Sequence, residues 1–223
     1  MTQALTLRAL ARLLCYPDDA LVGHLPDVAE VLAASEELSP QNKQALAELV
    51  SDLLRRDWLE VEARYVDTFD RGRRTSLHLF EHVHGDSRDR GPAMIDLQQT
   101  YAGSGLYLAE GELPDFLPVV LEFASTQPPE VARGFLAEMA HILNALHSAL
   151  AERDNPYAAV IAAVLQLAGE PVQRVAVQAD APVDESWEEP EVFGGCSSAG
   201  QQAPGQPQPI RIVRNTTSQG AAA

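Results

Sequence analysis

The chain has 223 residues, of which 46% are hydrophobic, and it carries a formal net charge of -16 at pH 7. This length and apolar content suit one sizeable core with a tail. The acidic balance excludes nucleic acid as a partner, because phosphate binding requires a basic surface. It also disfavours anionic membranes and favours basic protein segments as partners.

The N-terminus and the cysteines indicate a soluble, cytoplasmic protein. The first residues show no basic or apolar signal region, and the longest apolar stretch, residues 158–165, is much shorter than the roughly 20 residues of a membrane span. Cys15 and Cys196 form no CxxC motif, so neither a disulfide framework nor a cysteine zinc site is expected.

Apolar residues recur every three or four positions through most of the first 169 residues, which predicts amphipathic helices. The clearest stripes occupy residues 21–32, 46–54, 131–150 and 157–168. We therefore predict an all-α fold: a single compact, bundle-like helical domain of about eight or nine helices over residues 1–169.

Several residues predict where these helices begin and end. Ser39 and Asn155 each precede a proline, which is typical of a capping residue before the first helical position. The Pro128–Pro129 pair predicts the start of a long helix from about Glu130, and Gly169 predicts the end of the last helix.

The composition changes after Gly169. An acidic stretch surrounds Trp187, and the chain beyond Gly194 is rich in Gly, Ser, Gln and Pro. Such a segment buries too little apolar surface to offset its ordering entropy. We predict that residues 170–223 form a flexible, disordered tail.

A cluster of polar residues in the middle of the chain permits two interpretations. In the first, His78, His82, His84 and Asp86 bind a metal and the protein is a metal-dependent hydrolase, although the HExxH order is absent. In the second, no metal binds, and a loop between Gly85 and Gly91 is organised by ion pairs. The charged residues of that loop are Asp86, Arg88, Asp89 and Arg90. No catalytic motif occurs elsewhere, and we favour the second interpretation.

Acidic residues dominate the stretch from Tyr101 to Ala151, which contains six acids and one base. A solvated acidic face is the simpler interpretation. The functional interpretation is an apolar groove with an acidic rim that accepts a basic, amphipathic peptide. The candidate peptide-binding residues are Tyr65, Phe69, His82, His84, Glu112, Leu113, Asp115, Phe116, Leu117 and Glu122. Tyr65 and Phe69 can face either the core or the groove, and the core is the more common location for helical aromatics. Asp115 is also a candidate cap for the helix that follows it.

Two strings carry a family resemblance: FEHVHGDSRDRG at residues 80–91, and LPDFLP at 113–118 followed by LEF at 121–123. With these strings, the chain resembles the delta-chain assembly chaperones of respiratory nitrate reductases, a branch of the molybdoenzyme maturation chaperones. The resemblance implies an all-helical fold, no catalysis and no stably bound cofactor. It implies a partner: the molybdenum-containing catalytic subunit, bound through its N-terminal peptide while molybdenum cofactor is inserted before membrane docking. A third possibility is a permanent structural subunit of a larger complex.

Overall fold

The computed structural model describes residues 3–85 and 87–175, and within them every regular element is helical. Ten α-helices and one 3₁₀ turn follow one another along these residues. They are α1 Gln3–Leu14, α2 Asp19–Ala34, α3 Pro40–Arg55, α4 Trp58–Phe69, η1 Arg73–Thr75, α5 Leu79–His84, α6 Arg90–Gly103, α7 Leu117–Thr126, α8 Pro129–Glu138, α9 Ala140–Ala151 and α10 Ala158–Ala168. The predicted all-α fold is confirmed, and the acidic segment around Trp187 lies outside the described residues.

The described part of the chain has slightly more helices than the eight or nine expected, partly because the predicted long helix after Pro129 is two helices. Met139 separates α8 from α9 with φ -94° and ψ 2°. Its N–H bonds to the carbonyl of Leu136 at 3.1 Å, which closes a tight turn. The apolar spacing continues across this turn, so periodicity alone did not show the break.

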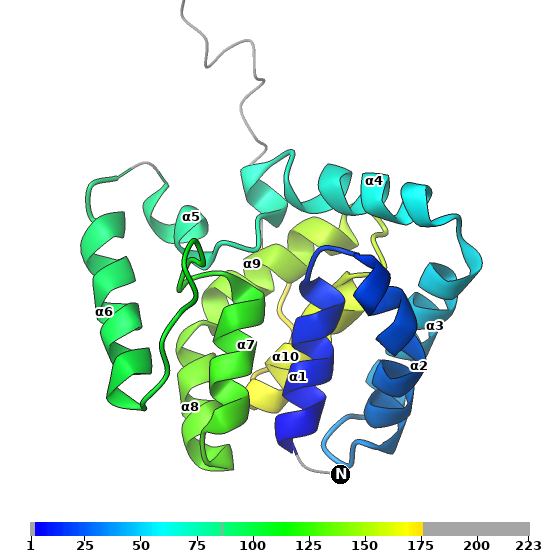
Figure 1. Ribbon diagram of the computed structural model, residues 1–223, viewed down its shortest axis with the longest axis horizontal. Coiled ribbons are helices and arrows are strands. Elements are labelled where there is room, and N and C mark those ends of the chain that lie inside the picture. The colour runs from blue at the N-terminus through cyan, green and yellow to red at the C-terminus, as the bar shows by residue number, and fades with distance from the viewer. Residues whose placement is uncertain (1–2, 86, 176–223) are drawn as a thin grey trace, which may run out of the picture. The chain divides into compact units, whose positions relative to one another are not determined.

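Helix α10 lies at the centre of the fold and packs against α1, α3, α8 and α9 (Figure 1). Its sequence is apolar almost all round, which is typical of a helix buried on every side. Val160, Ile161, Val164 and Leu165 are fully buried. The α2–α3 pair lies on one side of α1, and α7 lies on the other (Figure 1).

The predicted helix ends are mostly found where the sequence placed them. The hydroxyl of Ser39 accepts the N–H of Asn42 at 3.2 Å, as an N-cap does. Gly169 ends α10 in the left-handed conformation, with φ 78°. Asn155 accepts the N–H of Tyr157 at 3.0 Å, but α10 itself begins later, at Ala158.

Residues 170–175 follow α10 without regular secondary structure and bond to side chains of α9. The side chain of Asn144 accepts the N–H of Gln173 at 2.6 Å, and the hydroxyl of Ser148 accepts the N–H of Val175 at 3.0 Å. Both α9 side chains are buried, so this stretch of backbone covers polar groups that would otherwise face the core edge unpaired.

Helices α5 and α6 stand at one edge of the fold (Figure 1). The chain enters and leaves this region through one antiparallel bridge, between His78 and Phe116. Only Leu97 and Tyr101 of α6 are buried. No helix within residues 3–85 and 87–175 is both long and apolar enough to cross a bilayer.

Candidate functional site: a groove between α1, α7 and the 104–116 loop

Two cavities that share lining residues form a groove along α7. The volumes of the cavities are about 380 and 420 Å³, and Glu112, Val119 and Glu122 line both. We call this continuous hollow the α7 groove. The other residues of the first cavity are Arg8, Tyr101, Leu106, Tyr107, Leu108, Phe123, Ser125 and Thr126. The other residues of the second are Cys15, His78, Gly111, Leu113, Phe116 and Pro118.

The floor of the groove is the seam between α1 and α7. The two helices are antiparallel, so Arg8 lies beside Ser125 near one end, and Cys15 shares the second cavity with Pro118 near the other. Val119 and Phe123 follow one another on the groove face of α7 at helical spacing. The seam therefore gives the groove a straight, partly apolar base.

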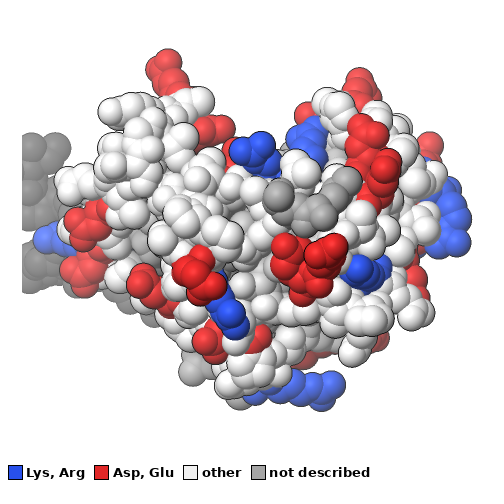
Figure 2. All heavy atoms as spheres, turned by 90° about the horizontal axis from the view of Figure 1, so that it is seen from below, with Lys and Arg blue, Asp and Glu red and all other residues white. Residues whose placement is uncertain are grey.

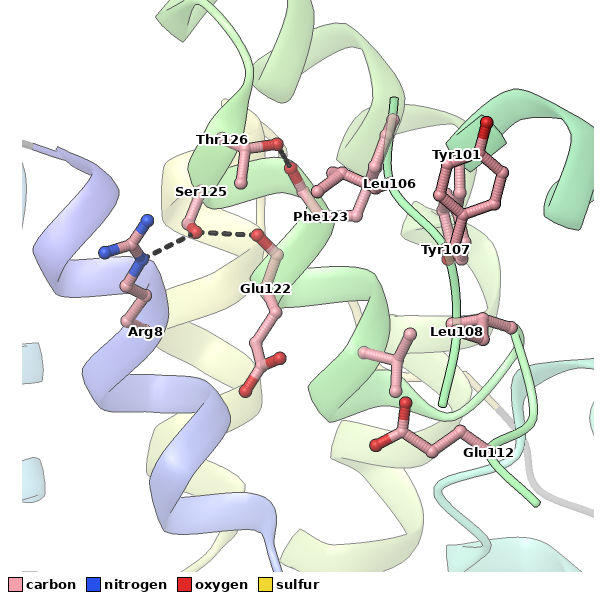
Figure 3. Close-up of a pocket in the computed structure, with 11 residues that line it drawn as sticks. Arg8, Tyr101, Leu106, Tyr107, Leu108, Glu112, Glu122, Phe123, Ser125 and Thr126 are labelled. Carbon is pink, nitrogen blue, oxygen red and sulfur yellow. Dashed lines mark hydrogen bonds between the residues drawn. The ribbon is translucent and has the colours of Figure 1, made fainter. Parts of the chain in front are cut away.

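The opposite wall is the loop between α6 and α7, which carries exposed apolar side chains. Tyr107 is 83% exposed and Leu113 is 43% exposed. In Figure 3, this loop faces α7 across the cavity, with Glu112 between the two, whereas Glu122 extends from α7 on the side of α1. Apolar groups left open to solvent beside a cavity are a feature of interaction surfaces.

The loop is held in place by hydrogen bonds from α6. The hydroxyl of Tyr101 donates to the carbonyl of Pro114 at 2.8 Å, and the N–H of Leu106 bonds to the carbonyl of Tyr101 at 3.0 Å. The ring of Tyr101 packs on Phe123, with ring centroids 4.5 Å apart. Tyr101 thus joins α6, the loop and α7 through a single buried side chain.

A fully buried carboxylate, Asp115, fixes the other end of the loop. One of its oxygens accepts the N–H of Phe80 at 3.1 Å and lies 3.7 Å from the guanidinium of Arg90. The other lies 3.5 Å from Nδ1 of His78. This neighbouring carboxylate raises the pKa of His78, against the opposing effect of burial. The prediction that Asp115 caps α7 is wrong, because α7 begins at Leu117 without a side-chain cap. The Asp115 carboxylate instead caps α5, where it accepts the N–H of Phe80.

The acids of the groove are available for a partner. Among the described residues, the carboxylates of Glu112 and Glu122 form no ion pair, although Glu112 accepts the N–H of Ala109 at 3.1 Å. Acidic side chains are spread over the face shown in Figure 2, with basic side chains between them. The charged residues that line the groove are Arg8, Glu112 and Glu122.

The structure brings four of the predicted peptide-binding residues together in the groove: Glu112, Leu113, Phe116 and Glu122. The other candidates lie elsewhere. Tyr65 and Phe69 are each only 4% exposed and belong to an aromatic cluster of the core with Tyr157. Leu117 is buried in the core, and Asp115 is a buried residue of the loop whose carboxylate contacts Phe80 and Arg90.

The three central histidines have separate partners. His78 approaches Asp115, a ring nitrogen of His82 lies 2.8 Å from the carbonyl of Ser76, and the ring of His84 packs edge-on against Phe80. No group of three or more His, Cys, Asp or Glu side chains within residues 3–85 and 87–175 is arranged to hold a metal ion. Asp86, the fourth proposed ligand, lies outside the described residues, and the hydrolase interpretation finds no support.

The arginine Arg90 of the Gly85–Gly91 loop pairs with residues outside the loop, and not with acids inside it as expected. Arg90 reaches out of the loop to Glu81 at 3.5 Å and to the buried Asp115. Asp89 exchanges hydrogen bonds with Ser87, and Arg88 is exposed. Arg90 therefore connects the Gly85–Gly91 loop to α5 and to Asp115, shortly before α7.

Several groove residues were absent from the sequence-based candidates, above all Arg8, Tyr107 and Val119. Arg8 is far from the central motifs in sequence, so no local pattern connects it to them. Tyr107 had a usable signal, since Leu106, Tyr107 and Leu108 form an apolar run directly after a Gly–Ser–Gly turn.

Comparison with known proteins gives a consistent result. The family model described as nitrate reductase delta subunit matches residues 35–163. The chain is 42% identical over 193 residues to NarJ of Escherichia coli K12, named as a nitrate reductase molybdenum cofactor assembly chaperone, and the match covers 82% of each chain. It is also 42% identical over 152 residues to the nitrate reductase-like protein NarX of Mycobacterium tuberculosis, covering 68% of this chain and 22% of that protein.

A solved structure shares the fold. It is assigned as a redox enzyme maturation protein from Archaeoglobus fulgidus, and it aligns with a TM-score of 0.54 at 20% sequence identity. The alignment covers 76% of this chain and 96% of the other. At this identity the likeness concerns the helical architecture alone.

Proposed function

The chain belongs to the nitrate reductase delta subunit family, and we propose that its α7 groove binds the N-terminal segment of the catalytic subunit of a respiratory nitrate reductase. The family predicted from residues 80–91 and 113–118 is thereby confirmed. Like its relatives, the chain acts as an assembly chaperone; it is not an enzyme. Molybdenum cofactor is the client's cargo, and we propose that this chain holds no cofactor stably and works in the cytoplasm, before the client docks at the membrane.

The observation that carries this proposal is the combination of an apolar floor with unpaired acids. Val119, Phe123 and Phe116 line the groove, and Glu112 and Glu122 lie where its two cavities meet. An amphipathic helix places its apolar residues in such a groove at positions i, i+3, i+4 and i+7. Basic residues flanking that stripe would meet Glu112 and Glu122.

A groove of this kind suits a temporary partner. The charges of its polar rim are hydrated when no partner is bound and pair with the partner's charges in the complex. The partner therefore binds quickly and dissociates without a large barrier. A permanent subunit would instead hide a larger, more apolar face. This distinguishes the chaperone from the structural-subunit alternative, which requires the chain to remain in the mature membrane enzyme.

Calorimetric titration with a synthetic peptide tests the proposal. The peptide would copy about 15 residues from the client's N-terminus, and we expect a Kd on the order of micromolar at low salt. The double variant Glu112→Gln/Glu122→Gln should weaken binding about five- to tenfold, because each removed charge contributes up to about 1 kcal/mol.

The matched control is Glu30→Gln/Glu130→Gln, which removes the same charge from exposed positions on α2 and α8. This variant should bind as the unmodified chain does. The proposal fails if the peptide gives no binding heat at about a hundred times the expected Kd, or if both double variants weaken binding equally.

A further inference from the structure

The two ends of the α7 groove carry different charges. Among the residues that the structure describes, Arg8 is the only Arg or Lys that lines either cavity, and it lies at the Ser125 end. The acids Glu112 and Glu122 lie in the middle, where the cavities join. The far end is formed by Cys15, His78 and Phe116. The groove is therefore electrically asymmetric along its length.

Arg8 is held in place without being neutralised. Its Nε donates to the hydroxyl of Ser125 at 3.0 Å, and that hydroxyl donates to the carbonyl of Glu122 at 2.6 Å. Arg8 forms no ion pair with any residue of the described chain. In Figure 3, the Glu122 carboxylate points away from the Arg8 guanidinium. The cation and the anion thus stay separately available, although they emerge from facing helices.

The spacing of these charges fits the length of a short helix. Cys15 directly follows α1 and is seven residues from Arg8, which corresponds to about 10 Å at 1.5 Å per residue. Pro118 and Ser125 have the same separation on α7. A client helix of about two turns would therefore extend from the Arg8 end, past the acids, to the His78 end.

The backbone dipoles of the floor oppose one another where the two helices end together. Helices α1 and α7 are antiparallel, and at the Pro118 end of the groove the C-terminus of α1 lies near the N-terminus of α7, so their partial charges largely cancel there. At the other end, the last turn of α7 lies beside Arg8, which is in the middle of α1. The charged side chains therefore determine the direction of a client helix.

We propose that the α7 groove binds its client helix in one direction, with the basic N-terminal part beside Glu112 and Glu122 and the C-terminal end at Arg8. The inference rests on the proposed function and specifies how the same groove is used. The unsatisfied carbonyls and any acidic side chain in the last helical turn meet the guanidinium. The reversed helix would place its basic residues beside Arg8 and its C-terminus beside the acids.

Two designed peptides test the direction on the full-length chain. Both are amphipathic helices of about 14 residues with one apolar stripe. The first carries lysines in its N-terminal half and a glutamate in its last turn. The second exchanges these charges and keeps the stripe and the composition. We expect the first to bind about tenfold tighter at low salt, and the ratio to shrink at high salt as screening increases.

Arg8→Glu then reports on the residue itself. This variant should reduce the preference about tenfold, or to none, by weakening the first peptide and strengthening the second. Arg55→Glu is the matched control, since Arg55 is an exposed arginine on α3, and it should leave the ratio unchanged. Circular dichroism and the unfolding midpoint verify that both variants fold.

The outcomes separate the inference from the function on which it depends. Equal binding of the two peptides, or a ratio that Arg8→Glu does not alter, overturns the direction while the groove stands. If neither the designed peptides nor the client's own segment bind, both the direction and the proposed function are overturned. A preference for the second peptide overturns the inference, because it assigns the opposite direction.

Discussion

The buried carboxylate of Asp115 accepts a hydrogen bond at 3.1 Å from the backbone N–H of Phe80, a residue 35 positions earlier in the chain. The N–H groups in the first turn of a helix have no partner within the helix, so a helix start needs an acceptor from outside. Here the acceptor for α5 comes from the loop before α7. The contact fixes the α5–α6 region against the groove and connects the two strings that carry the family resemblance.

Replacement of Asp115 by alanine should lower the free energy of unfolding by about 3 kcal/mol, because Arg90 and the N–H of Phe80 lose a buried acceptor. Asp115→Asn should cost less, since an amide oxygen still accepts the N–H. Urea denaturation measures both values. Asp96→Ala, at an exposed position on α6, should change stability by less than about 0.5 kcal/mol. Equal effects at the two sites would contradict the role of Asp115.

His78 should make stability depend on pH. Asp115 raises the pKa of His78 above 6.5, with a smaller contribution from Glu81 and an opposing one from Arg90. The added stability is therefore fully present below about pH 6.5, and it is lost as the pH rises through the raised value. The difference in unfolding free energy between the unmodified chain and His78→Gln should fall as the pH rises above this range.

The difference between the two proteins is the quantity to measure, because burial lowers the pKa of His147 and gives the opposite pH dependence. His147 is present in both proteins, so its contribution cancels. If the difference stays constant between about pH 5.5 and pH 8.5, His78 is not coupled to Asp115. Client binding should also weaken at low pH, where a protonated His78 adds positive charge beside a basic peptide.

Two glycines near α8 should respond to alanine in opposite ways. Gly169 has φ +78°, a backbone conformation that alanine rarely adopts, and an added Cβ would also meet the guanidinium of Arg133, so Gly169→Ala should destabilise by about 1 kcal/mol or more. Gly134 is exposed within α8 and has open space around it. Gly134→Ala should stabilise by about 0.5–1 kcal/mol. Thermal unfolding of both variants tests the pair, and a shift of the same sign in both would refute the assignment.

Residues 170–175 should separate from α9 one hydrogen bond at a time. Asn144→Ala removes the acceptor for the N–H of Gln173, whereas Ser148→Ala removes the acceptor for the N–H of Val175. Amide hydrogen exchange should accelerate about fivefold at the corresponding residue, because each lost bond is worth about 1 kcal/mol. The amide of Ile161 in the centre of α10 provides the internal reference. Faster exchange at Ile161 as well would indicate a general loss of stability.

Part of the groove was predictable from the sequence, and part was not. Glu112, Leu113, Phe116 and Glu122 were placed correctly near one another because they occupy one short stretch rich in acids and apolar residues. Tyr65 and Phe69 have the same helical spacing whether they face a groove or the core, and the structure places both in the core. Their roles depend on what packs over α4, which no local pattern contains.

The sequence by itself determined the all-helical architecture, most helix ends and the family, because apolar periodicity, capping residues and the central motifs are local features. Only the tertiary structure decided that Asp115 caps α5, that Met139 divides the predicted long helix, and that Arg8 meets Ser125 across 117 residues. These relationships depend on which helix faces pack together. That choice is made by the core as a whole, and the groove and its polarity follow from it.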